Sequence, residues 1–410
     1  MVKHFFYKHR FNIFTLMNFT KNIIFFFCLI IFNHNLSSQS DEDYKEFLYN
    51  NVKPYDENTG LISDSDYSKY RLFVVGEVHW QKENSKIFLR IFRNLYKKAN
   101  VRIIFLESGY SIGIIAQHYL ETGNPESLKI ISEDGQFDEF HYRFLKDFYD
   151  KCPADDKFKI IGIDIENFSL DNGFIYAVRL LFNDIAIPEK LNAFLKDFET
   201  TIEKEDYIVV VEKFDEIYLD YRHNKENYKI LLNEKYFEYS ELMERMRKSL
   251  KFEFYNYNYG KDSLEHTKRE NYIFKNIARE IKKYPNCNYY GQFGIAHIGL
   301  SRFLSTSEEN KINSFVSQLN NSDYSPVKDS VFSSLVLYMN EYQGDNNKYL
   351  FYYYDFNYSL STRTYLPPKV FKILKGCKLE EGFYFVNLDQ ENSPFKKFAE
   401  KNYQFLILKK

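Results

Sequence analysis

The sequence predicts an α/β fold: a mostly parallel central sheet flanked by helices, with a helical insertion and a β-rich C-terminal extension of the sheet. Apolar runs of strand length alternate with segments in which apolar residues recur at helical spacing, which is typical of a parallel sheet with crossover helices. The segment 165–285 is charged and mainly helical, and strand-like runs return after it. We therefore expect the insertion to interrupt the sheet between two of its strands.

The predicted elements follow the chain in that order. The expected strands before and after the insertion are 71–75, 101–106, 158–163 and 288–293, and the helices among them are 83–99, 111–121 and 137–151. Within the insertion we expect helices at 191–203, 206–220, 235–251 and 263–283, and a tyrosine-rich loop at 255–260. The C-terminal strands are 331–339, 348–356, 383–388 and 403–408, and the turn at 343–347 predicts that the first two pair with each other.

The N-terminal segment 1–40 has the pattern of a secretory signal peptide. Lys21 precedes an apolar run at 23–32, and a short polar stretch follows at 33–40. That run is shorter than the roughly 20 residues that a transmembrane helix needs. Met17 begins a tidier signal peptide than Met1 does, which favours it as the true start. We therefore expect an exported protein, periplasmic, secreted or on the cell surface, with no stable transmembrane anchor beyond this segment.

The remaining chain divides into a lead-in at 41–69 and one α/β domain at 70–410, whose helical insertion is 165–285. The chain has 410 residues, of which 44% are hydrophobic, so a sizeable core is expected. Removing 1–40 removes four basic residues and no acidic one, which takes the formal charge from −2 to −6. Such a balance gives no general attraction to phosphate backbones, so we expect a small-molecule substrate and no nucleic-acid partner.

Three cysteines remain after the signal segment: Cys152, Cys287 and Cys377. This odd and sparse number is not the framework of a disulfide-rich protein. One bridge is compatible with the count, but the sequence does not say which pair would form it. None of the three lies in a CxxC motif, so we interpret them as structural residues.

Four turns that follow apolar runs carry acidic or histidine side chains. They place Glu77 and His79, Glu107, Asp164, and His297 at the ends of the four strands predicted before and after the insertion. In an open α/β sheet, ligands bind in the crevice at the carboxyl ends of the strands. If these strands are parallel neighbours, the five side chains converge on one site. This is the main reason to interpret the chain as an enzyme.

The first turn, Gly76-Glu77-Val78-His79, is the sharpest local signal. Residues two apart on an extended backbone face the same side, so Glu77 can hold one tautomer of His79 and raise its basicity, as a general base requires. In the third turn we favour Asp164 over Glu166, because Asp164 directly follows the glycine-containing strand. Arg269, on the predicted helix 263–283, is a candidate anion clamp or oxyanion stabiliser.

A divalent metal is the alternative chemistry for this mixture of histidine and carboxylate. In that case Glu77, His79 and His297 are the predicted ligands. The sequence has no HxxxH or HExxH pair, however. The cofactor expectation is therefore either none or a divalent metal.

The order of these motifs resembles the erythromycin esterase-like family and its wider relatives, the ChaN-like and Tiki/TraB-like proteins. Those proteins share a Gly-Glu-x-(x)-His turn, a glutamate after the next strand, a Gly-x-Asp turn and a late glycine-rich turn with histidine. The corresponding segments here are Gly76-Glu77-Val78-His79, Glu107, Gly162-Ile163-Asp164 and Gly294-Ile295-Ala296-His297, and Arg269-Glu270 with Asn276 is similar to an Arg-Asp/Glu helix of the esterases.

The resemblance has departures. A single residue, Val78, separates the glutamate and histidine of the first turn, and Trp80 follows where the esterases have glycine. Leu300 stands where the esterases commonly carry a second histidine. The spacing of the first turn is closer to the ChaN and Tiki branches, whereas Arg269-Glu270 and the long insertion are closer to the esterases.

The resemblance implies a secreted hydrolase that cleaves an ester, a lactone or a related acyl bond. His79 would be the general base on a water molecule, oriented by Glu77, and Glu107 would complete the acid–base set. His297 and Arg269 would stabilise the developing oxyanion. The relatives imply two alternatives: a Tiki/TraB-like metal-dependent hydrolase or peptidase, and a non-enzymatic ChaN-like protein that binds haem or iron.

Overall fold

The computed structural model describes residues 40–410 with gaps at 56–59, 61, 63, 80, 82, 134–136, 167–171, 203–206, 260–262, 302–312, 339–369, 371–372 and 375. Residues 1–39 of the signal segment, Trp80 and the predicted strand 348–356 thus fall outside the described residues. One compact unit contains Lys53–Asp345, Leu379–Glu391 and Lys396–Lys410, and it holds the sheet. No helix within the described ranges is long and apolar enough to cross a membrane.

The sheet has eight strands in the order β1-β7-β8-β6-β2-β5-β3-β4. Its six strands from β8 to β4 run parallel to their neighbours, whereas β7 is antiparallel to both β8 and β1. The strands are β1 (Lys53–Pro54), β2 (Leu72–Glu77), β3 (Val101–Leu106), β4 (Lys159–Gly162), β5 (Asn288–Gly294), β6 (Val331–Tyr338), β7 (Phe383–Asn387) and β8 (Phe405–Lys409). The predicted fold class is confirmed.

Both faces of the sheet are covered by helices, and the alternation of side chains along β5 shows how. The ring of Tyr290 packs against Phe88 of α4 (Asn84–Lys98), with 4.7 Å between the centroids. The neighbouring Tyr289 points to the opposite face and donates a hydrogen bond of 3.1 Å to the carbonyl of Ile281 on α13 (Ser263–Lys283). Because both faces are buried, the strands are continuous apolar runs rather than alternating ones.

The helices between β2 and β4 follow the predicted pattern. Asp138 begins α7 (Glu139–Lys151): its side chain accepts a hydrogen bond of 3.0 Å from the amide of His141, as a good N-cap does. A second helix, α5 (Tyr110–Thr122), ends at Gly123, which has the left-handed φ of 73° that favours glycine. The other helices of the first half are α3 (Asp64–Tyr67) and α6 (Pro125–Glu133), with the short η1 (Ala154–Asp156).

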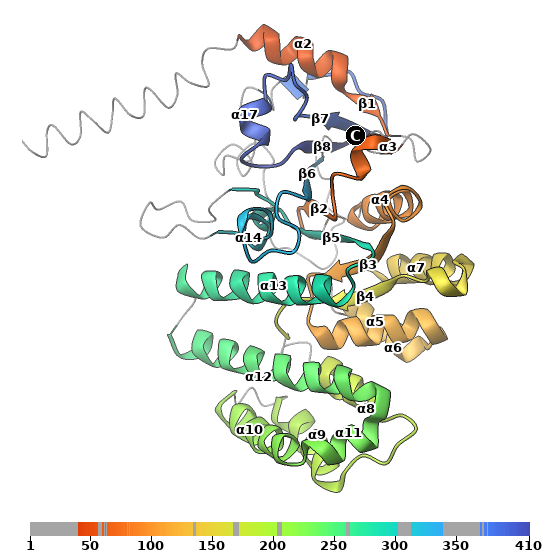
Figure 1. The fold of residues 1–410 in the computed structure, drawn as a ribbon, viewed down its shortest axis with the longest axis vertical. Coiled ribbons are helices and arrows are strands. Elements are labelled where there is room, and N and C mark those ends of the chain that lie inside the picture. Colours follow the sequence, from red (N-terminus) through yellow and green to blue (C-terminus); the bar gives the residue numbers. More distant parts are fainter. Residues whose placement is uncertain are drawn as a thin grey trace, which may run out of the picture. The chain divides into compact units, whose positions relative to one another are not determined.

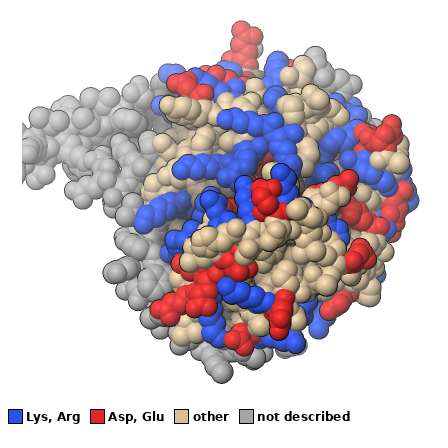
Figure 2. All heavy atoms as spheres, turned by 60° about the horizontal axis from the view of Figure 1, so that its bottom comes forward, with Lys and Arg blue, Asp and Glu red and all other residues tan. Residues whose placement is uncertain are grey.

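The chain between β4 and β5 is helical, as predicted. Its elements are α8 (Asn172–Leu181), α9 (Glu189–Ile202), α10 (Tyr207–His223), α11 (Lys225–Leu232), η3 (Asn233–Lys235), α12 (Tyr236–Tyr259) and α13. Figure 1 shows α12 and α13 as two long helices that lie side by side, joined by ion pairs such as Arg279–Glu241. The predicted loop at 255–260 is wrong, because α12 continues to Tyr259. Charged side chains of both signs occur on the face shown in Figure 2.

The C-terminal strands extend the sheet on the other side of β2. β6 pairs with β2 along one edge and with β8 along the other, both in parallel. The predicted partner strand 348–356 lies outside the described residues, so the hairpin stays a prediction; among the described strands, the neighbours of β6 are β2 and β8. The lead-in contributes the edge strand β1, in which Lys53 pairs with Phe385. The remaining elements of this part are η4 (Ile295–His297), α14 (Phe315–Asn321) and α17 (Lys396–Ala399).

The second compact unit includes α2 (Asp41–Asn51) and Asn392–Phe395. Ser40 and Asp43 form a reciprocal capping box at the start of α2. Tyr44 and Phe47 on the buried side of this helix pack against Phe395, with ring centroids 4.9 and 5.7 Å apart.

The cysteines Cys152, Cys287 and Cys377 are free thiols.

Candidate active site

Four neighbouring parallel strands bring the predicted turns together. The order β2-β5-β3-β4 places the carboxyl end of β2, which carries Glu77, beside that of β5, where residue 294 pairs with it. Glu107 follows β3 directly, and Asp164 lies two residues beyond β4. His297 ends the short η4 that continues from β5. All five turn residues, and Arg269 from α13, therefore lie at the carboxyl ends of the parallel strands.

Glu77 and His79 form a hydrogen-bonded pair. The Nδ1 atom of His79 lies 3.2 Å from Oε1 of Glu77. The Glu77 side chain is only 1% exposed, whereas that of His79 is 48% exposed. Gly76 permits this turn, because a Cβ at that position would lie 2.4 Å from the side chain of Ile298. A buried carboxylate thus orients an accessible imidazole.

Gly294 is the point at which the turns of β2, β3 and β5 meet. Its amide donates a hydrogen bond of 2.7 Å to Oε2 of Glu107. The position that a Cβ of residue 294 would occupy lies 2.6 Å from Nε2 of His79 and 3.6 Å from Cδ2 of His297. His79, Glu107 and His297 are therefore within reach of one common point.

A chain of ion pairs continues from Glu107 in both directions. Its Oε1 atom lies 3.3 Å from Nε2 of His297 and 3.2 Å from Nη2 of Arg269. Arg269 also binds Asp164 through two nitrogens, with Nε donating to Oδ1 at 3.0 Å. On the other side, Nδ1 of His297 lies 2.7 Å from Oε1 of Glu270. Arg269 and His297 therefore each bridge two carboxylates.

The charges in this series of ion pairs determine the protonation states of Glu107 and His297. Burial by itself would lower the pKa of His297, but Glu270 and Glu107 outweigh it and raise this pKa to about 10. Burial would likewise raise the pKa of Glu107, yet His297 and Arg269 hold it well below its usual range. At neutral pH these shifts favour an imidazolium at His297, whose two nitrogens lie against carboxylates, and a carboxylate at Glu107.

In the Glu77–His79 pair the pKa values of both side chains are raised. Burial raises the pKa of Glu77, although the hydrogen bonds from His79 and Gln292 oppose the shift. Burial opposes protonation of His79, but its hydrogen bond to Glu77 and the negative charge of Glu107 raise its pKa above the ordinary value. His79 is therefore the accessible imidazole of this group, and the two carboxylates favour its charged form.

Two residues that support this arrangement had no assigned role in the sequence analysis. Gln292 on β5 donates through Nε2 to Oε2 of the buried Glu77 and to the carbonyl of Asn84 at 3.3 Å. Glu270 accepts a hydrogen bond of 2.6 Å from the amide of Phe315 while it binds His297. A polar residue inside an apolar strand run was the signal for Gln292, and an acid beside Arg269 was the signal for Glu270.

Three further titratable residues, Glu166, His141 and Arg143, lie outside this group. Glu166 accepts hydrogen bonds from the amide and hydroxyl of Ser111 at 3.2 and 2.5 Å, so it holds the start of α5. His141 is fully buried and stacks on the ring of Phe137 with 3.9 Å between centroids. Arg143 pairs with Glu139 one turn earlier on the exposed side of α7. The structure does not bring these residues into the group around Gly294.

The predicted metal ligands can be compared with the nitrogen and oxygen atoms that the site offers to a metal ion. Both nitrogens of His297 face carboxylates, which leaves no lone pair for a metal. Within the described ranges, no three His, Cys, Asp or Glu side chains are arranged to hold a metal ion. The predicted ligand set of Glu77, His79 and His297 does not fit a metal ion in this arrangement.

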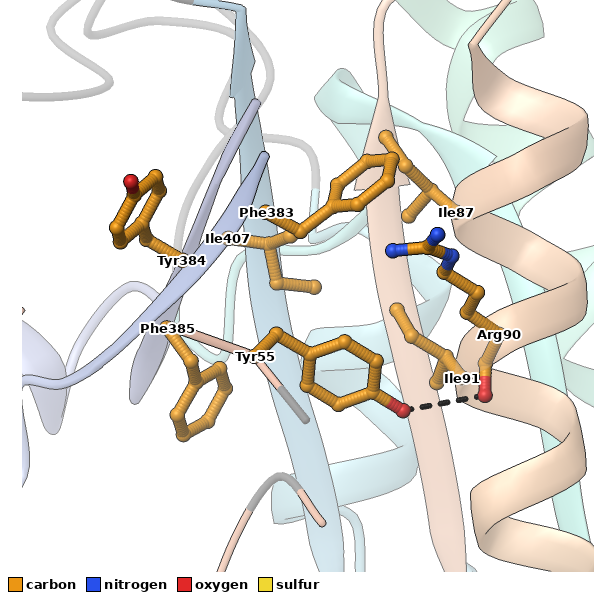
Figure 3. A pocket seen from close by; sticks show the side chains of 8 residues that line it. All are labelled: Tyr55, Ile87, Arg90, Ile91, Phe383, Tyr384, Phe385 and Ile407. Carbon is orange, nitrogen blue, oxygen red and sulfur yellow. Dashed lines mark hydrogen bonds between the residues drawn. The ribbon is translucent and has the colours of Figure 1, made fainter. Parts of the chain in front are cut away.

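A small apolar pocket lies apart from these residues. It is formed between α4 and the strands β7 and β8, and Tyr55 closes one side by donating a hydrogen bond of 3.1 Å to the carbonyl of Arg90 (Figure 3). The Arg90 guanidinium lies 4.7 Å from the centroid of the Phe383 ring. None of the six site candidates lines this pocket.

Comparison with solved structures supports the fold. A Bacillus cereus protein of known structure has a TM-score of 0.59 and 13% identity, covering 90% of this chain and 97% of its own. A mutant of the erythromycin esterase EreC in its open conformation has a TM-score of 0.59 and 11% identity, with 87% and 96% covered. A succinoglycan biosynthesis protein has a TM-score of 0.59 and 10% identity, with 90% and 97% covered.

The sequence itself matches no protein-family model, and it matches no curated protein. The solved structures nevertheless align with this chain over nearly their whole length. The predicted resemblance is therefore confirmed at the level of the fold: the chain has the fold of erythromycin esterase.

Proposed function

We propose that the chain is an exported hydrolase in which His79, held by Glu77, activates a water molecule that attacks an ester, a lactone or a related acyl bond. The observation that carries the proposal is the pair itself: a buried carboxylate bonded to the Nδ1 side of an exposed imidazole. With its proton on Nδ1, His79 presents the lone pair of Nε2, as a general base must. The fold shared with erythromycin esterase supports a hydrolytic reaction.

The proposed reaction involves two proton transfers. Nε2 of His79 takes a proton from water as the oxygen adds to the acyl carbon, which gives a tetrahedral oxyanion. The imidazolium then returns the proton to the leaving alkoxide as the acyl–oxygen bond breaks. The carboxylates of Glu77 and Glu107 stabilise the imidazolium while it exists.

The remaining residues act by charge and position. Arg269 is 27% exposed and lies next to Glu107, so it is the cation placed to face the oxyanion. His297 is only 9% exposed and both its nitrogens bind carboxylates, so we assign it to positioning Glu107. Glu107 stays ionised and contributes its charge rather than a proton.

The test uses purified protein and a panel of p-nitrophenyl esters and lactones. We expect His79→Ala to lower kcat/KM by about 10² to 10⁴, and Glu77→Gln to lower it in the same direction. The matched control is His223→Ala, because His223 is an exposed histidine at the end of α10. Unchanged turnover in His79→Ala would sink the role of His79. A Soret band on haem titration would favour the haem-binding alternative.

A further inference from the structure

The segment 162–166 follows β4 at the edge of the sheet. Among the strands that the structure describes, β4 has a neighbour on one side only, which is β3. On that side the amides of Ile163 and Asp164 donate to the carbonyls of Leu106 and Ser108 at 3.2 and 3.0 Å. The polar backbone groups on the other side have no strand to meet, and leaving them buried without partners would be costly.

Side chains of α12 and α13 take the place of the missing strand. Three of their polar groups form hydrogen bonds with backbone groups of the segment. These contacts are Arg245 Nη1 donating to the carbonyl of Gly162 at 3.0 Å, Asn276 Nδ2 donating to the carbonyl of Ile163 at 2.9 Å, and the amide of Glu166 donating to Ser249 Oγ at 2.9 Å. The segment that carries Asp164 is therefore held from both sides.

Arg245 is the most constrained of the three side chains. It is fully buried, its Nη2 donates to Oε1 of Glu280 at 2.6 Å, and its guanidinium lies 4.2 Å from the centroid of the Tyr110 ring. A planar guanidinium can bind a carboxylate and a carbonyl at once, whereas an ammonium is a point charge that does not reproduce this fork. Arg245→Lys thus keeps the charge opposite Glu280 and loses the fixed contact with Gly162.

We propose that Arg245 is a positioning residue of the site. It fixes the 162–166 segment, so that Asp164 holds Arg269 against Glu107. The inference rests on the proposed function only where it speaks of catalysis, because the fixed geometry of the segment can be measured without any substrate. It also assigns the insertion a role beyond covering the sheet: α12 and α13 set the position of one catalytic turn.

The first test is amide hydrogen exchange of the whole protein, followed by mass spectrometry. In Arg245→Lys we expect the peptide covering 160–166 to exchange roughly tenfold faster or more, because a hydrogen bond from a charged group is lost. Peptides of α12 and α13 should keep their exchange rates. Ser249→Ala, a smaller change, should accelerate the same peptide to a lesser extent.

The matched control is Arg247→Lys. Arg247 lies on the same helix, but its Nε donates to Oδ1 of Asp215 at 2.9 Å and its guanidinium lies 4.1 Å from the ring centroid of Tyr218. The identical chemical change there should leave the 160–166 peptide unaffected. Faster exchange spread evenly over α12, α13 and the segment would mean a general loss of stability, and it would overturn the proposal. An unchanged segment would overturn it as well.

The second test measures hydrolysis in the same variants. We expect Arg245→Lys to lower kcat roughly tenfold while KM stays within about twofold. Because Arg245 acts through Asp164, Arg245→Lys combined with Asp164→Asn should be no slower than Asp164→Asn alone. Additive losses would overturn the positioning role. If wild-type protein hydrolyses nothing in the panel while the exchange result holds, the proposed function fails and the held segment remains.

Discussion

The amide of Gly294 and the carboxylate of Glu107 are joined by a hydrogen bond of 2.7 Å between the ends of β5 and β3. The other oxygen of Glu107 faces His297 and Arg269. The carboxylate is therefore anchored by backbone on one side and by two cations on the other. A group held in this way keeps its charge and its place, which suits a fixed electrostatic partner for His79 rather than a mobile proton carrier.

Gly294→Ala should lower activity almost as much as His79→Ala. The added Cβ would lie 2.6 Å from Nε2 of His79, so the imidazole must move from its present position. The backbone at residue 294 has φ −52° and ψ 138°, which alanine adopts without strain, so the fold should persist. Measured kcat/KM should fall about 10² or more, with the unfolding midpoint little changed.

The control for that substitution is Gly376→Ala, because a Cβ there would have no heavy atom within 4 Å. It should leave kcat/KM as in wild type. Wild-type turnover in Gly294→Ala would mean that His79 functions in another position.

Gln292→Leu should move the acidic limb of the pH–activity profile to higher pH. The amide of Gln292 donates to the buried carboxylate of Glu77 and opposes the rise of its pKa. Without this donor the pKa of Glu77 rises further, so the pair with His79 is lost at a higher pH. The profile of kcat/KM against pH measures the shift. Gln318→Leu on α14 is the matched control, and an unmoved limb in Gln292→Leu would contradict the role of Gln292.

His297 should make the protein less stable as the solution becomes alkaline. Its pKa is raised to about 10 by Glu270 and Glu107, above the ordinary value of 6.5. The stabilisation is therefore complete below pH 6.5 and is lost as pH rises toward 10, at up to about 1.4 kcal/mol per unit. Urea denaturation between pH 7 and 10 should show this decline in wild type. His297→Gln should be less stable at pH 7 and show a flatter dependence; an equal slope would count against the imidazolium.

His141 should make the protein less stable as the solution becomes acidic. It is fully buried between aromatic rings, with Phe88 at 4.7 Å and Phe137 at 3.9 Å, and burial lowers its pKa to about 3. The unfolded chain binds a proton at this residue below pH 6.5 and the folded chain does not, so stability falls as pH drops from 6.5 toward 3. His141→Phe should reduce that decline. Its measurement is denaturant unfolding at pH 5 and pH 7, with His223→Ala as the control.

The positions of the four strands that carry the site were predictable from the sequence. Apolar runs ending in Glu77, Glu107, Asp164 and the glycine-rich turn before His297 have no other clear reading in an α/β chain. Their order was not predictable: β5 lies between β2 and β3, although the chain reaches it only after the insertion. Pairing between strands distant in sequence depends on packing that a local pattern does not contain.

The supporting residues were hidden for a similar reason. Arg245 lies among charged residues of α12, where its spacing predicts a solvated helix face, yet it is fully buried against Gly162 and Glu280. The tyrosine-rich run ending at Tyr259 lacks strong helix formers, but it continues α12. For Arg245, tertiary contacts outweigh local preference.

The way β4 is covered also bears on solubility. A strand at the edge of a sheet offers unpaired backbone groups to any other extended chain, and natural proteins protect such edges. Here the side chains of Arg245 and Asn276 occupy the carbonyls of Gly162 and Ile163 that a foreign strand would otherwise find. Detaching α12 and α13 would therefore expose this edge beside Asp164, and forms of the protein that lack these helices should self-associate.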